Sequence, residues 1–171
     1  MRRFVQLTMA LVLMTGIAVS IGTGARAAQP QPQPVTLECA TDMSVQVLGN
    51  ATPASAEDQA LVLVRAFFGP GGGIGPHTHP GTLVVAVESG QFGVTLEEEG
   101  MQMDVMRASD DAATPAVTEP LTAGEETVLN PGDWFVETGM VHSARTVGDE
   151  PVAVVFTGLV EAGQPVTACV E

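Results

Sequence analysis

Short runs of alternating apolar and polar residues, separated by Gly, Pro, Asn and Asp, recur along most of the chain. Phe92, Val94 and Leu96 would share one face of an extended strand, and Met101 and Val105 one face of the next. This two-residue period is that of a half-buried β-strand, and no stretch keeps the 3.6-residue period of a helix. Regularly spaced short strands favour an all-β sandwich or closed barrel. The predicted strands are Val35–Cys39, Ser44–Leu48, Ala60–Phe68, Thr82–Glu88, Phe92–Glu98, Met101–Arg107, Glu126–Leu129, Asp133–Glu137, Val141–Thr146, Pro151–Thr157 and Val166–Val170.

Three segments carry further expectations. Glu98, Glu99 and Gly100 lie between two alternating runs, which predicts a hairpin turn. The strand Thr82–Glu88 is apolar on both faces, so it is covered by a second sheet or lies in a subunit contact, and a homodimer is one interpretation. The acidic, Ala/Thr/Pro-rich stretch 109–120 has no period and is predicted to be a surface loop.

The first 27 residues have the layout of a secretory signal peptide. Arg2 and Arg3 precede an apolar run from Phe4 to Ile21, and Ala25-Arg26-Ala27 is a small-x-small cleavage signal. An uncleaved membrane anchor is the alternative, because the run is close to the roughly 20 residues that a bilayer needs. The expected organisation is a signal peptide over 1–27, a Pro/Gln linker over 28–34 and one domain over 35–171, secreted or periplasmic.

The composition of the chain then limits the classes of macromolecule that it could bind. Without the signal peptide, three arginines stand against 20 acidic residues, a formal charge of −17, and there is no lysine or tyrosine. So acidic a surface repels nucleic acid and anionic membranes. Cys39 and Cys169 lie near opposite ends of the domain. In an oxidising compartment an even pair indicates a disulfide, with two free thiols as the alternative.

The three histidines are the residues that point to chemistry. His77 and His79 are two residues apart, so an extended strand places both imidazoles on the same face. A neutral imidazole is a common ligand of zinc, copper, iron and nickel. With His142 as a third ligand, the sequence predicts a site for one divalent metal ion.

The surroundings of these histidines carry a family resemblance. Gly71, His77, His79 and Gly90 have the spacing of the first signature of the cupin superfamily, in which Leu83 stands at the glutamate position. The second signature is similar to the segment that holds Gly132, Gly139 and His142. There the spacing after Gly132 is one residue short, with Glu137 at the proline and Thr146 at the asparagine.

The resemblance covers about Leu61 to Thr157 and implies a double-stranded β-helix, a jelly-roll barrel that holds a metal in its mouth. It maps His77, His79 and His142 onto the three histidine ligands and leaves the glutamate ligand absent at Leu83. Some cupin dioxygenases with an all-histidine iron site also lack that glutamate. The loss could equally mark a domain without metal affinity.

Three functions remain open at this point. The first is a metal-dependent module that binds a small molecule in the barrel mouth. The second is a non-haem dioxygenase or isomerase acting on a small apolar substrate, and the third is a metal-free structural domain. For the metal, affinity trends favour copper or zinc, whereas the resemblance favours iron, manganese or nickel. No catalytic residue is identified, because no acid/base partner can be assigned.

Overall fold

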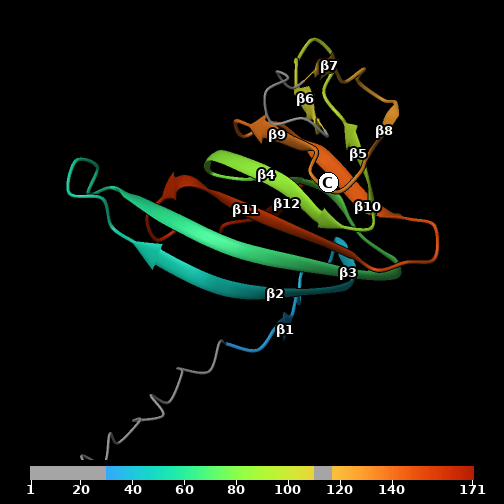
Figure 1. The fold of residues 1–171 in the computed structure, drawn as a ribbon. Coiled ribbons are helices and arrows are strands. Elements are labelled where there is room, and N and C mark those ends of the chain that lie inside the picture. Colours follow the sequence, from blue (N-terminus) through green and yellow to red (C-terminus); the bar gives the residue numbers. More distant parts are fainter. Residues whose placement is uncertain (1–29, 110–116) are drawn as a thin grey trace, which may run out of the picture.

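The computed structural model describes residues 30–109 and 117–171, and this part of the chain is all-β (Figure 1). No helix within these two ranges is long and apolar enough to span a bilayer. The expected signal peptide lies outside the described residues. The strands are β1 (Gln33–Pro34), β2 (Ala40–Ala51), β3 (Gln59–Thr78), β4 (Gly81–Ser89), β5 (Gln91–Leu96), β6 (Asp104–Arg107), β7 (Val117–Pro120), β8 (Glu126–Leu129), β9 (Trp134–Glu137), β10 (His142–Val147), β11 (Val152–Glu161) and β12 (Ala168–Cys169).

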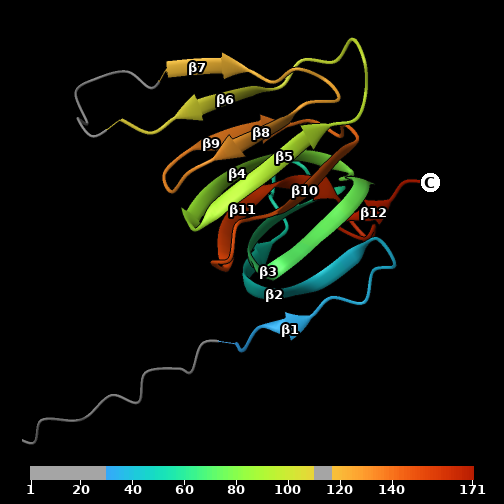
Figure 2. The same cartoon turned by 90° about the vertical axis from the view of Figure 1, so that its right-hand side faces the viewer.

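The strands form one antiparallel sheet that curls on itself into a jelly-roll barrel (Figures 1 and 2). Its order is β7-β6-β9-β4-β11-β3-β10-β5-β8, and β2 and β12 also pair with β3. The curled sheet has two facing walls, and strand β3 contributes to both of them. Its first half pairs with β11 and its second half with β10 and β12, whereas β2 runs along both halves as far as Ile74. The end of β3 therefore lies where the two walls meet.

The glycine-rich run that ends the first half of β3 allows this change of partners. Positions 69–75 continue the strand rather than form a loop, although glycine weakens most strands. A Cβ atom on Gly72 would lie 2.6 Å from the carbonyl oxygen of Asp42, and one on Gly73 would lie 2.8 Å from that of Ala144. The neighbouring backbones approach so closely that only glycine fits, and this brings β10 alongside the end of β3.

The core lies between the two walls and follows the predicted alternation. Phe92, Val94 and Leu96 are all buried, as the two-residue period of β5 requires. Leu83, Val85 and Val87 face the core from β4. The disulfide predicted between Cys39 and Cys169 is present.

Three local predictions were wrong. No hairpin joins the two strands on either side of Glu98–Gly100, because β5 pairs with β8 and β10 while β6 pairs with β7 and β9. Met101 is accordingly exposed. The stretch Val35–Cys39 is not a strand, because β1 ends at Pro34 and β2 begins at Ala40. The segment 117–120, expected within a loop, forms β7 as the edge strand beside β6. Of the Pro/Gln segment, Gln33 and Pro34 pair with β2 as β1.

Candidate metal centre

The end of β3 and the start of β10 bring all three histidines together. His77 and His142 are direct partners in the antiparallel register, and His79 follows β3 by one residue. All three side chains are buried. The ring centroids of His77 and His142 are 4.2 Å apart, and His79 lies 5.0 Å from the first and 5.4 Å from the second. One nitrogen from each ring lies within 4.8 Å of the other two.

Backbone carbonyl groups fix which nitrogen faces the shared space. The Nδ1–H of His77 donates to the oxygen of Gly75 at 2.9 Å, and that of His142 donates to Met140 at 3.0 Å. His79 donates from Nδ1 to the oxygen of Val166 at 2.6 Å. A carbonyl oxygen can only accept, so Nδ1 carries the proton in each ring and Nε2 keeps a lone pair. Histidines that bind metals typically donate their other ring N–H to a carbonyl or carboxylate oxygen in this way.

Burial keeps these rings neutral. It lowers the pKa of His77 to about 3, helped by the charges of His142 and His79, and it lowers the pKa of His79 to about 4. The pKa of His142 is also lowered by burial. A histidine must be unprotonated at one nitrogen to bind a metal. The three side chains therefore fit a divalent cation in both geometry and protonation state.

An apolar cavity of about 290 Å³ opens onto the histidines. Among the described residues, its wall contains no carboxylate, and its polar side chains are Thr167 and the histidines themselves. Phe68, Phe135 and Phe156 are large apolar side chains that come from three different strands, β3, β9 and β11, to form part of this wall. The apolar wall consists of Val35, Leu37, Met43, Val45, Val47, Val64, Ala66, Phe68, Ile74, Leu83, Val85, Phe92, Phe135, Ala144, Val154, Phe156 and Val166.

A buried carboxyl group lies next to the site on the neighbouring strand. Glu137 in β9 is fully buried and pairs directly with Leu83 in β4. Its Oε2 accepts the N–H of Gly139 at 2.8 Å, and its Oε1 has no hydrogen-bond partner among the described residues. Burial raises its pKa to about 7, against the lowering effect of the Gly139 N–H. Glu137 does not belong to the group of close ligand atoms, so it supports the turn before His142 rather than facing the cavity.

No family model matches the chain, and no curated protein matches it in sequence. Solved structures are similar in fold. KdgF from a Halomonas species is 17% identical, with a TM-score of 0.46, over 74% of this chain and 85% of that one. A cupin 2 conserved barrel domain protein from Rhodopseudomonas palustris is 16% identical, with a TM-score of 0.44, over 82% and 75%. A cupin superfamily protein from Desulfitobacterium hafniense is 12% identical, with a TM-score of 0.47, over 78% and 95%.

Two features of the site were not predicted from the sequence. Val166 and Thr167, which contact His79 through Nδ1, come from the far end of the chain, 87 and 88 residues away. Their role depends on the pairing of β12 with β3, which leaves no local signal in the sequence. Arg145, three residues after His142, does not line the cavity and forms an exposed ion pair with Glu126.

Proposed function

We propose that this domain binds one divalent metal ion through the Nε2 atoms of His77, His79 and His142. The observation that carries the proposal is the uniform use of Nδ1 as a donor to backbone carbonyl groups, which directs three lone pairs at one place. Three neutral ligands leave the charge of a divalent ion uncompensated. The ion would therefore keep open positions for water or an anion.

We further propose that the metal presents these open positions to a small molecule in the apolar cavity. The wall offers apolar contact on nearly every side, so the ligand is mostly apolar with one oxygen-containing head group for the metal. When bound, the ion would act as a Lewis acid toward that head group. The three histidines would hold the ion in place. The apolar wall would exclude water around the apolar part of the ligand, so that only its head group makes polar contacts.

Binding without turnover is the function that the cavity wall supports best. An isomerase needs a group that accepts and returns a proton, and no carboxylate, lysine or tyrosine lines the described cavity. A non-haem dioxygenase remains the second candidate, because oxygen chemistry at a redox-active metal needs no protein base. Oxygen uptake by the iron-loaded protein, set against a zinc-loaded sample, distinguishes the two.

Metal content tests the proposal against a metal-free structural domain. The purified protein is loaded with excess Zn²⁺, Fe²⁺, Mn²⁺, Ni²⁺ or Cu²⁺, desalted and measured by mass spectrometry. We expect about one ion per chain for at least one metal. A protein that keeps no ion under any of these conditions would be a structural domain.

We also propose that the chain is exported and that a second copy covers the outer face of β3, β4 and β11. The disulfide is compatible with an oxidising compartment. Leu61, Leu63, Val84 and Leu159 are exposed on that face, and cross-strand pairing brings Leu61 next to Leu159. The strand β4 is thus apolar toward both the core and this face, as a subunit contact requires.

A further inference from the structure

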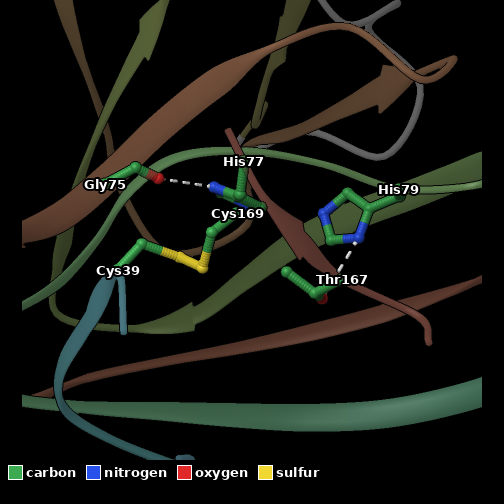
Figure 3. The surroundings of a disulfide bond; sticks show 6 residues. All are labelled: Cys39, Gly75, His77, His79, Thr167 and Cys169. Atoms are coloured by element: carbon green, nitrogen blue, oxygen red, sulfur yellow. Dashed lines mark hydrogen bonds between the residues drawn. A yellow bond between two sulfur atoms is a disulfide. The ribbon is translucent and has the colours of Figure 1, made fainter. Parts of the chain in front are cut away.

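The last described strand lies against the histidine-bearing end of β3. Ala168 pairs with Thr78 and Cys169 with His77, so β12 runs directly beside the His-x-His segment. Just before it, Val166 accepts the Nδ1–H of His79, and the Thr167 hydroxyl oxygen lies 3.3 Å from the same nitrogen (Figure 3). The orientation of His79 therefore depends on where residues 166–169 lie.

The other end of the disulfide reaches His77 by a comparable route. The carbonyl oxygen of Cys39 accepts the N–H of Gly75 at 2.7 Å, and the oxygen of Gly75 accepts the Nδ1–H of His77. Figure 3 shows the Cys39–Cys169 bridge beside the hydrogen bond between Gly75 and His77. One covalent bond thus joins the two backbone segments that orient two of the three histidines.

Little else holds the C-terminal segment in place. Strand β12 is two residues long, and residues 161–165 before it are exposed. Glu161 and Ala162 donate to the oxygens of Pro80 and Asp58 where the segment begins. From there on, beyond the pairing itself, Val170 donates to the oxygen of Pro76 at 2.9 Å, and Val166 packs partly against the core. A segment with so few buried contacts opens at low free-energy cost once its covalent anchor is removed.

We propose that the Cys39–Cys169 disulfide and Thr167 are positioning elements of the three-histidine site, so that metal affinity depends on the oxidation state of the disulfide. This inference rests on the metal binding proposed above. Reduction by an external dithiol breaks the Sγ–Sγ bond, transfers two electrons and two protons to form two thiols, and leaves the dithiol as its own disulfide. The released segment then no longer holds the Nδ1–H of His79, and that ring rotates more freely.

The effect follows from what outer partners do for metal ligands. Removing a group that orients a ligating histidine typically lowers metal affinity by about 10- to 100-fold. We expect a loss in that range when the disulfide is removed, because contacts to both His77 and His79 are loosened. Removing the Thr167 hydroxyl alone should weaken binding less, by roughly 3- to 10-fold, because Val166 still accepts from His79.

The test is a Co²⁺ titration of the full chain, followed by the visible absorption of the bound ion, which reports its coordination. Four proteins are compared: the oxidised wild type, Cys39→Ser/Cys169→Ser, Thr167→Val and Thr167→Ser. Circular dichroism fixes a temperature at which each is folded. The proposal expects weaker binding and an altered spectrum in the double variant, a smaller loss in Thr167→Val and wild-type affinity in Thr167→Ser.

The outcomes separate this inference from the proposed function. If the oxidised wild type binds no Co²⁺, metal binding itself fails. If it binds Co²⁺ and the folded double variant matches it in affinity and spectrum, the positioning role is overturned and metal binding stands. If the double variant does not fold, Thr167→Val decides: an affinity equal to that of the wild type overturns the proposal, and a loss that Thr167→Ser restores supports it.

Discussion

Leu83 and Glu137 lie directly opposite each other on β4 and β9, one at the cavity wall and the other buried beside it. The Leu83 side chain cannot coordinate a metal, and the buried carboxyl group beside it belongs to the neighbouring strand β9. There the carboxylate accepts the N–H of Gly139 in the turn that precedes His142. Its role is to support that turn, and the three histidines remain the candidate ligands.

The burial of Glu137 beside Leu83 predicts how the stability of the folded protein depends on pH. The pKa of Glu137 is raised from 4.5 to about 7 in the folded protein, so folding takes up a proton between these values. The stability that this group contributes is full below pH 4.5 and is lost as the pH rises through 7. Replacing Glu137 with Gln keeps an acceptor for Gly139 and removes the titration.

We therefore expect Glu137→Gln to be more stable than the wild type at pH 8, by ~1–3 kcal/mol, and close to it at pH 4.5. Urea unfolding of the metal-free proteins at both pH values measures the difference. If Glu137→Gln differs from the wild type by the same free energy of unfolding at pH 4.5 and at pH 8, Glu137 does not titrate in this way.

Much of the fold and site could be predicted because the signals are local. The period of β5 and the spacing of His77 and His79 are short-range patterns, and both are confirmed in the structure. Which strands pair with each other was not predicted correctly. The turn residues at Glu98–Gly100 predicted a hairpin, but the strand partners are set by competition among all edges of the sheet, and β10 occupies the edge of β5.

The site could be predicted only as far as its side chains. His142 had a sequence signature, whereas the carbonyl groups that orient the three rings belong to the backbone and have no residue type to recognise. The contact from Val166 spans 87 residues and depends on a strand two residues long. The close approach of Asp42 and Ala144 to the glycine run likewise depends on strand pairing and has no local signal in the sequence.

The apolar cavity predicts a chain-length series for ligands. Straight-chain monocarboxylates should bind to the metal-loaded protein about fourfold more tightly per added methylene, because each buried methylene contributes about 0.8 kcal/mol. The gain should stop when the cavity of about 290 Å³ is filled. Calorimetric titration from acetate to octanoate measures this series.

A variant with a smaller cavity provides the control. Ala66 is buried in the wall, so Ala66→Leu should abolish the gain for the longer acids and leave acetate binding unchanged. Ala86→Leu, on the opposite face of the sheet, should leave the whole series as in the wild type. A series that is flat in the wild type would show that the tail does not enter this cavity.

The disulfide predicts a large contribution to stability. It links residues 130 positions apart, and in the chain-entropy model a loop of that length corresponds to about 5 kcal/mol. Cys39→Ser/Cys169→Ser should lower the free energy of unfolding by an amount approaching this value, as measured by urea unfolding. A change below about 1 kcal/mol would mean that the unfolded chain is already constrained.

The exposed outer face predicts a salt-dependent dimer. Each chain carries a formal charge of −14 over its full sequence, so salt that screens the repulsion should raise the dimer fraction. Leu63→Glu should abolish the dimer, whereas Gln91→Glu adds the same charge on β5, away from this face, and should not. Light scattering coupled to size-exclusion chromatography measures the molar mass of each protein. A wild type that is monomeric at every salt concentration would rule the contact out.

The most direct test of the account is a metal titration of the wild type, His142→Ala and Ser143→Ala, each shown to be folded. Ser143 is the next residue of β10, does not line the cavity and donates to Glu97, which makes it the matched control. We predict one ion per chain in the wild type and in Ser143→Ala, and an affinity at least ~100-fold lower in His142→Ala. Equal affinity in all three proteins, or no bound metal in any of them, would contradict the account.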